Sequence, residues 1–336
     1  MKDGSINKFV IKTFLATIPL VALLLLYIIV DPFAVVRSHK PCPAFGSVYP
    51  FNKGYISTCA YIENREARNY NAFILGSSRT IFFRATDWAK HIGADARIFH
   101  FDASNETPEG IYLKLKYIDE HGDSIKYAVI EMPGIFFSDR NEYISYRVPW
   151  QLDGYIYAPD FHYYYFNRFL DWSMFKCIFN HKFTGKIPEG EDTKKVVFMN
   201  TVIDGYDTTT NETYFNARDS LYSHNPEKGL SPIYNPILFH YTECIATETH
   251  YSFLRKIRSI LDKHRTDYKV ILGPMGDYSI LREEEKQVIM SIFGKENVCD
   301  LSTFPAAYDG TMTFYDNLHF TPTIGKKMLE TAYSSK

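Results

Sequence analysis

The sequence predicts an α/β protein in which helices cover both faces of a mostly parallel sheet, with a transmembrane helix before it and an aromatic-rich insertion within it. Short apolar segments, typical of buried strands, alternate along the chain with amphipathic segments of helical period. This alternation predicts βαβ units, whose strands pair in parallel and whose helices pack on the sheet. A long uncharged segment near the N-terminus and a central change in composition predict the other two parts.

The N-terminal segment, residues 13–30, contains no charged residue. Its 18 residues approach the roughly 20 apolar residues needed to cross a bilayer. Lysines at positions 2, 8 and 12 precede it, and this bias favours a cytoplasmic tail, residues 1–12, with the rest of the chain outside the cytoplasmic membrane. The alternatives are a buried core helix and a cleaved signal peptide, although residues 31–36 offer no clear cleavage site. We therefore expect a single-pass anchor.

Residues 31–69 are expected to form a stalk that leads into the globular domain. Cys42 and Cys59, which lie in this stretch, bracket a short loop, and the pattern suits either a disulfide or two buried thiols. None of the five cysteines has Cys-x-x-Cys spacing, so neither a metal knuckle nor a redox dithiol is predicted.

Two series of strand and helix patterns, in residues 70–134 and 247–336, are expected to form one sheet domain. The expected strands are Phe73–Leu75, Ile98–Phe101, Tyr127–Met132, Lys269–Leu272 and Val298–Leu301, and the expected helices are Pro108–Glu120, Tyr251–His264, Ser279–Phe293 and Pro322–Ala332.

The insertion between the two series, residues 135–246, has a high density of aromatic residues, with 17 of them between Phe136 and Phe183. Flat rings with a polar edge suit a lid or platform that binds sugar rings or an acyl carrier. The alternative is that the rings fill the core of a small subdomain or lie against the membrane surface. We expect the second use for most of these rings, with a few lining a cleft.

Two short polar segments carry the chemistry that the sequence suggests. The first, Gly-Ser-Ser-Arg at residues 76–79, directly follows an expected strand. The second, Asp-Asn-Leu-His at residues 316–319, precedes the last expected helix. Ligands bind at the carboxyl edge of doubly wound sheets, so both segments are expected to meet at one site. A Ser, a His and an Asp together supply a nucleophile, its base and the group that orients the base, which predicts serine acyl transfer.

These segments resemble the first and last blocks of the SGNH/GDSL hydrolase superfamily, in which Gly-Asp-Ser carries the nucleophile and Asp-x-x-His the rest of the triad. The resemblance covers about residues 70–135 and 265–335. It implies a flavodoxin-like doubly wound sheet of SGNH type. It also implies that Ser78 is the nucleophile, His319 the base and Asp316 the orienting carboxylate.

Ser77 stands where the common first block has Asp. This variation is similar to the branch that contains D-alanyl-lipoteichoic acid transfer proteins and membrane-anchored polysaccharide O-acetylation proteins. The superfamily's second and third blocks supply a Gly amide and an Asn side chain to the oxyanion hole, but the matching residues 101–108 contain no Gly and residues 129–134 no Asn. The backbone amide of Ser78, the Asn105 side chain and Ser77 are the expected substitutes.

Arg79 is a further candidate for substrate binding, because a guanidinium recognises a carboxylate or phosphate. Equally, it could cap the following turn or pair with Glu131. The sequence has no His-Glu-x-x-His pattern or other metal-ligand spacing, and no metal or cofactor is predicted. The net charge of -2, without runs of Lys or Arg, argues against a nucleic-acid partner.

Taken together, the patterns and the resemblance predict a membrane-anchored, extracytoplasmic serine acyltransferase or esterase that acts on a cell-envelope glycan or acylated polymer. A multi-spanning membrane acyltransferase is a candidate partner. The main alternative is a catalytically silent SGNH-like module that binds glycan or tethers such a partner in an envelope acylation system. A lipid or phosphodiester hydrolase of the same fold is the third possibility.

Overall fold

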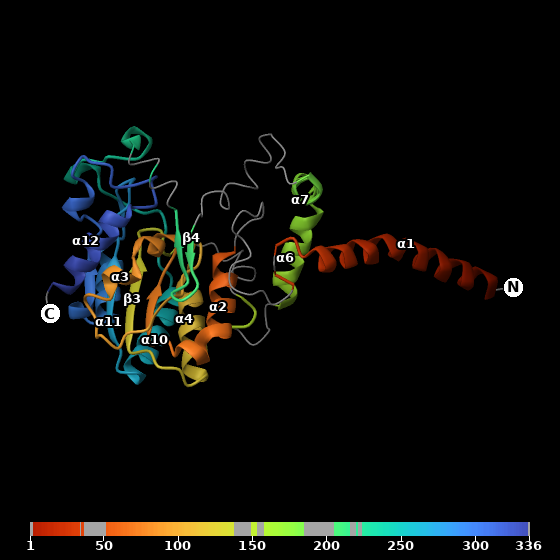
Figure 1. Ribbon diagram of the computed structural model, residues 1–336, viewed down its shortest axis with the longest axis horizontal. Helices are drawn as coiled ribbons and strands as arrows, with labels where there is room; N and C mark the ends of the chain where they lie inside the picture. The colour runs from red at the N-terminus through yellow and green to blue at the C-terminus, as the bar shows by residue number, and fades with distance from the viewer. Residues whose placement is uncertain are drawn as a thin grey trace.

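The computed structural model describes residues 3–33, 35–36, 52–137, 149–152, 158–184, 205–215, 220 and 224–334. They form an α/β unit and a long N-terminal helix that projects away from it (Figure 1). Cys42 lies outside the described residues, so its pairing with Cys59 stays a prediction.

The central sheet has five parallel strands in the order β2-β1-β3-β7-β9. Numbered by succession in the chain, this is the order 2-1-3-4-5, which is common among doubly wound sheets. The interior strands β1 and β3 are buried along their whole length, as expected for strands covered on both faces. The strands are β1 (Ala72–Leu75), β2 (Ile98–His100), β3 (Tyr127–Met132), β7 (Asp267–Leu272) and β9 (Val298–Asp300).

Helices α2, α4, α10 and α11 contribute to the core on one face of the sheet. The stripe of Leu254, Ile257 and Leu261 on α10 is fully buried there, and Tyr61 of α2 stacks on Phe101 with ring centroids 5.0 Å apart. The helices are α2 (Lys53–Arg68), α4 (Pro108–Glu120), α10 (Glu248–Lys263) and α11 (Glu283–Phe293).

The opposite face is covered by η1 (Ser78–Phe82), α3 (Ala85–Trp88) and α12 (Pro322–Tyr333). Trp88 is fully buried in this layer, and its indole N–H donates a 2.9 Å hydrogen bond to the Tyr333 hydroxyl. Helices therefore cover both faces, and the predicted α/β class with a parallel sheet is confirmed.

The prediction of a helix over Ser279–Phe293 was wrong at its start. Ser279 and Ile280 form the short strand β8, which pairs in parallel with β6 (His240–Tyr241). The Asp277 carboxylate accepts hydrogen bonds from the backbone N–H and the hydroxyl of Ser279, which holds this turn outside the helix. The other expected strands and helices are present, with ends displaced by at most three residues.

Within residues 31–69, the expected stalk and lead-in, residues 53–68 form helix α2. The Asn52 side chain accepts a hydrogen bond from the Tyr55 backbone N–H and so caps this helix. The buried Lys53 ammonium donates to the Asn211 backbone oxygen at 2.9 Å, which ties α2 to the hairpin of β4 (Gly205–Asp207) and β5 (Glu212–Tyr214). The lead-in is thus part of the folded unit.

The insertion also contributes two helices, α6 (Ala158–Leu170) and α7 (Trp172–Thr184), near the end of α1 (Asp3–Val30). Many of their aromatic rings fill a separate core that includes rings from α1 and from the residues just after it. The remaining described elements are η3 (Pro226–Lys228), η4 (Pro236–Leu238), η5 (Lys295–Asn297) and η6 (Pro305–Ala307).

Within residues 8–30 of α1, an 18-residue window has a mean hydropathy of 2.6 and is almost entirely uncovered by the rest of the chain. Among the described residues it is the one helix long and apolar enough to cross a membrane.

Candidate active site

The turn that carries Ser77 and Ser78 leaves the carboxyl end of β1 through Gly76. This glycine has φ +149°, a value that residues with side chains rarely adopt. A Cβ atom there would lie 2.7 Å from Thr80 Cγ2 and 3.1 Å from the Glu131 carbonyl oxygen. The close approach of β1 and β3 therefore requires glycine immediately before the two serines.

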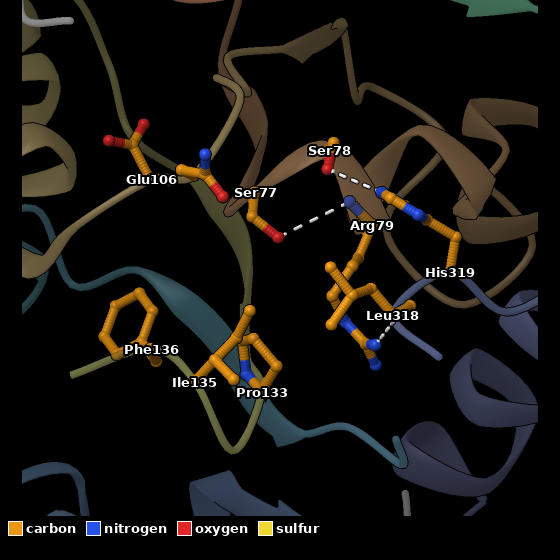
Figure 2. Close-up of a pocket in the computed structure, with 10 residues that line it drawn as sticks. Ser77, Ser78, Arg79, Glu106, Pro133, Ile135, Phe136, Leu318 and His319 are labelled. Carbon is orange, nitrogen blue, oxygen red and sulfur yellow. Dashed lines mark hydrogen bonds between the residues drawn. The ribbon is translucent and has the colours of Figure 1, made fainter. Parts of the chain in front are cut away.

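Ser77 accepts hydrogen bonds from other residues of the turn. Its hydroxyl accepts a 3.4 Å hydrogen bond from the Arg79 backbone N–H, and its carbonyl accepts from the Thr80 hydroxyl at 2.8 Å. The Ser77 side chain is buried, whereas Ser78 is partly exposed. The two hydroxyls thus point to different surroundings, and Figure 2 shows that Ser78 is the one directed at His319.

Ser78, His319 and Asp316 form a continuous hydrogen-bonded chain although 241 residues separate Ser78 from His319. The Ser78 Oγ lies 2.9 Å from His319 Nε2 (Figure 2). On the other side of the ring, His319 Nδ1 lies 2.9 Å from Asp316 Oδ2. These separations are within the range for proton transfer between a hydroxyl, an imidazole and a carboxylate.

The Asp316 carboxylate determines which imidazole nitrogen carries the proton. Burial alone would raise the pKa of Asp316, but hydrogen bonds and charge from His319 and the backbone N–H groups of Leu318 and His319 lower it to about 2. The carboxylate is therefore ionised at neutral pH and can only accept. His319 Nδ1–H donates to it, which leaves Nε2 to accept the Ser78 hydroxyl proton.

Arg79 is buried, and its guanidinium bonds to protein groups on three sides. Its Nε donates to Glu131 at 2.8 Å, one Nη donates to the Pro274 carbonyl at 2.6 Å, and the other donates to the Leu318 carbonyl. The same group lies over the Phe320 ring, 4.8 Å from its centroid. The pairing with Glu131, one of the uses expected for Arg79, is therefore present, and a role of Arg79 in substrate binding stays a prediction.

This arrangement joins the serine turn to two other loops at the carboxyl edge of the sheet. Pro274 follows β7, and Leu318 directly precedes His319, so one side chain fixes both loops relative to Ser78. Glu131 is fully buried, and burial raises its pKa while Arg79 opposes that rise. Gly273 leaves room for the pair, since a Cβ there would collide with the Glu131 carboxylate.

A pocket opens beside the serine turn at the carboxyl ends of β1, β2 and β3. Asn105, which has φ +51°, lines it from the loop after β2. Glu106 also lines it, but its carboxylate pairs with the buried Lys114 and is thereby neutralised. The lining residues are Ser77, Ser78, Arg79, Asn105, Glu106, Pro133, Ile135, Phe136, Leu318 and His319.

Phe136 is one of the insertion's aromatic rings, a few of which were expected to line a cleft, whereas the other apolar residues of this pocket were not singled out from the sequence. Pro133, Ile135 and Phe136 follow the carboxyl end of β3, so their position after an expected strand was the available signal. Phe82 packs edge-on against the His319 ring, with centroids 6.2 Å apart, and helps to hold the imidazole. Among the described residues, no group of His, Cys, Asp and Glu side chains could hold a metal ion.

Compared with known proteins, the sequence matches no family model and no curated protein.

Proposed function

We propose that this chain is a membrane-anchored serine acyltransferase or esterase of SGNH type. The observation that carries the proposal is the hydrogen-bonded chain from Ser78 through His319 to Asp316. A serine hydroxyl is a weak nucleophile until a neighbouring base accepts its proton, and the contacts of His319 supply that condition. The position of Ser78 and His319 in the lining of a pocket at the carboxyl edge of the sheet supports the same conclusion.

The reaction has two steps. His319 Nε2 takes the Ser78 proton while Oγ attacks the acyl carbonyl, and the charged imidazole then protonates the leaving alcohol as an ester forms on Ser78. In the second step, His319 removes a proton from an acceptor hydroxyl or from water, whose oxygen attacks the ester. The charged imidazole then returns that proton to the Ser78 Oγ as the ester bond breaks. Asp316 keeps the imidazole in the required tautomer and stabilises its charged form.

The oxyanion would be held by the backbone N–H of Ser78 and the side-chain amide of Asn105. Ser78 is the first residue of η1, and N–H groups at a helix start have no acceptor within the helix. Asn105 lines the same pocket and reaches it because its left-handed backbone turns the loop after β2. One such donor contributes on the order of 10²–10³ in turnover.

The location follows from α1. Its apolar length suits a single membrane crossing, and the lysines that precede the apolar segment favour a cytoplasmic N-terminus. The α/β unit would then lie outside the cytoplasm, where the hydroxyl groups of a cell-envelope glycan or polymer are the available acceptors. A multi-spanning membrane acyltransferase would deliver the acyl group to such a site.

A second candidate function is a non-catalytic module that binds glycan or tethers such a partner. The observation that favours it is the lack of Gly in residues 101–108 and of Asn in residues 129–134, where the SGNH/GDSL superfamily has its oxyanion donors.

Trapping of the acyl-enzyme separates these two functions. The full chain in detergent is mixed with p-nitrophenyl acetate, quenched in acid within seconds, digested and examined by mass spectrometry. We expect acetylation of Ser78, its loss in Ser78→Ala and its retention in Ser77→Ala, which serves as the matched control. Adding a carbohydrate acceptor then distinguishes transfer from hydrolysis by the product formed. An acetyl group found on no serine of residues 76–79 would favour the non-catalytic module.

A further inference from the structure

Helix α7 carries a row of aromatic rings along one side. Trp172, Phe175, Phe179 and Phe183 are spaced by three or four residues, so they share a helix face. Successive rings stack, with centroid distances of 5.9 Å, 4.2 Å and 5.9 Å along the row. The two end rings are largely uncovered, with Trp172 66% and Phe183 78% exposed. We refer to these four residues as the aromatic row.

The aromatic row is continuous with the end of α1. Phe175 contacts Phe169 of α6 at 5.7 Å between centroids, and Phe169 contacts Tyr27 of α1 at 5.5 Å. Tyr27 lies in the last turn of α1, three residues before its end at Val30. The aromatic row therefore lies close to the C-terminal end of the apolar helix α1.

The orientation of α6 and α7 relative to α1 suits contact with a bilayer surface. Figure 1 shows the two helices running across the direction of α1, at the junction between α1 and the α/β unit. A helix pair in this position lies along the surface of any bilayer that α1 crosses. Tyr and Trp are enriched at that level because they combine an apolar ring with a polar edge.

The charges of α7 suit a lipid surface. The helix contains Lys176 and Lys182 and no Asp or Glu. Lys176 is exposed and lies over the Trp172 ring, 5.0 Å from its centroid, so a cation stands beside an exposed aromatic ring. Basic residues next to aromatic rings are typical of helices that bind a membrane interface, where the cation meets lipid phosphates.

We propose that the aromatic row and Lys176 bind the surface of the bilayer that α1 crosses. This goes beyond the acyl chemistry and rests only on the membrane crossing by α1. A single transmembrane helix would leave the α/β unit free to tilt, whereas a second contact through α7 fixes its orientation. The pocket beside Ser78 would then be held at a constant height and direction relative to the bilayer.

Tryptophan quenching by brominated lipids tests the proposal. The full chain is inserted into vesicles of phosphatidylcholine and phosphatidylglycerol whose acyl chains carry bromine near the headgroup or near the chain end. Wild type is compared with Trp172→Phe, which keeps an aromatic ring in the row and removes one of the three tryptophans. We expect Trp172→Phe to lose most of the bromine-sensitive emission, and shallow bromine to quench more than deep bromine, because interfacial helices insert only about 5–10 Å.

Two lysine variants provide a matched pair. Anionic phosphatidylglycerol should increase the quenching of the wild type relative to vesicles of phosphatidylcholine alone, and Lys176→Glu should reduce this increase. Lys256→Glu should not, because Lys256 makes the same kind of contact, 4.8 Å above the Phe253 ring, on α10 of the α/β unit. Equal effects of the two variants would contradict a specific contact of α7 with lipid.

Flotation of the vesicles at alkaline pH checks insertion of the chain independently. Chain that fails to float with the lipid would refute the membrane crossing by α1, and the present proposal with it. Chain that floats while wild type and Trp172→Phe are quenched equally would refute the contact of α7 alone. Neither flotation nor tryptophan quenching depends on acyl turnover, so both results would be the same if Ser78 were catalytically inactive.

Discussion

Removal of the Arg79 guanidinium is expected to destabilise the fold and to slow the chemistry at Ser78. In Arg79→Met the buried Glu131 carboxylate loses its 2.8 Å partner, and the Pro274 and Leu318 carbonyls lose a donor. Methionine is long enough to fill much of the space, so the main loss is of charge and hydrogen bonds.

The expected cost follows from the burial of the pair. Breaking a fully buried ion pair by removing one partner costs about 3–5 kcal/mol. The loss of a donor to the two carbonyls should bring the cost toward the upper end of this range. Protonation of Glu131 should bring it toward the lower end, because burial already raises the pKa of this carboxyl and a neutral carboxyl is less costly to bury without a partner. Since about 1 kcal/mol shifts Tm by roughly 2–4 °C in chains of somewhat smaller size, we expect Tm to fall by about 6–20 °C.

The assay is thermal unfolding of the full chain in detergent, followed by near-ultraviolet circular dichroism. Arg255→Met is the matched control, because Arg255 pairs with Glu248 on the exposed surface of α10. Loss of such a surface pair costs at most about 1 kcal/mol. The double variant Arg79→Met/Glu131→Met should recover much of the stability, since two apolar groups can replace a buried pair at little cost.

The double variant also separates stability from positioning. It restores a neutral core but not the bridge from Arg79 to the Pro274 and Leu318 carbonyls, so the rate of Ser78 acetylation should stay low while Tm recovers. An Arg79→Met variant as stable as the Arg255→Met control, with only a raised KM, would refute this reasoning. That result would instead mark Arg79 as a group that binds substrate directly.

Three further predictions concern the same site. Asp316→Asn should lower acyl turnover by on the order of 10³–10⁴, because an amide can donate and so stabilises the wrong tautomer of His319; pre-steady-state acetylation measures this, with circular dichroism as the check on folding. The pKa of Asp316 is lowered to about 2, so the unfolded state binds the proton more tightly. The stability that the carboxylate contributes should be fully present above about pH 5 and be lost as the pH falls from there through about 2, as measured by denaturant unfolding of wild type against Asp316→Asn. Gly76→Ala should cost about 1–3 kcal/mol by the same method, because of its positive φ and the 2.7 Å approach to Thr80; a change below 0.5 kcal/mol would contradict the assigned strain.

Much of the sheet could be predicted from the sequence because its strands are short continuous apolar runs. Ala72–Leu75 and Tyr127–Met132 are buried on both faces, so nearly every side chain in them is apolar and their ends are sharp. The meeting of residues 76–79 with residues 316–319 could also be predicted. Parallel strands bring their carboxyl ends to one edge, whatever the distance along the chain.

Helix α2 could not be predicted because its buried face is not purely apolar. Lys53, Ser57 and Thr58 are buried alongside Tyr55 and Tyr61, which hides the helical period of its apolar residues. The burial of Lys53 depends on Asn211, which is distant in sequence and reaches it only in the folded chain.

The partner of Arg79 and the start of α11 also depend on tertiary structure. Arg79 had three plausible uses in the sequence, and the choice of Glu131 follows from the 2.8 Å separation that the pairing of β1 with β3 creates. Ser279 and Ile280 pair with His240 and Tyr241, and a two-residue strand leaves no periodic pattern to detect.

The most direct test of the central claim is labelling with an active-site-directed fluorophosphonate, followed by identification of the labelled peptide. The account predicts a covalent adduct on Ser78 in the wild-type chain, no adduct in Ser78→Ala, and much slower labelling in His319→Ala because the hydroxyl loses its base. Ser77→Ala should label at a rate close to that of wild type. Labelling that persists in Ser78→Ala and disappears in Ser77→Ala, or labelling that is indifferent to His319, would contradict the claim that His319 activates Ser78.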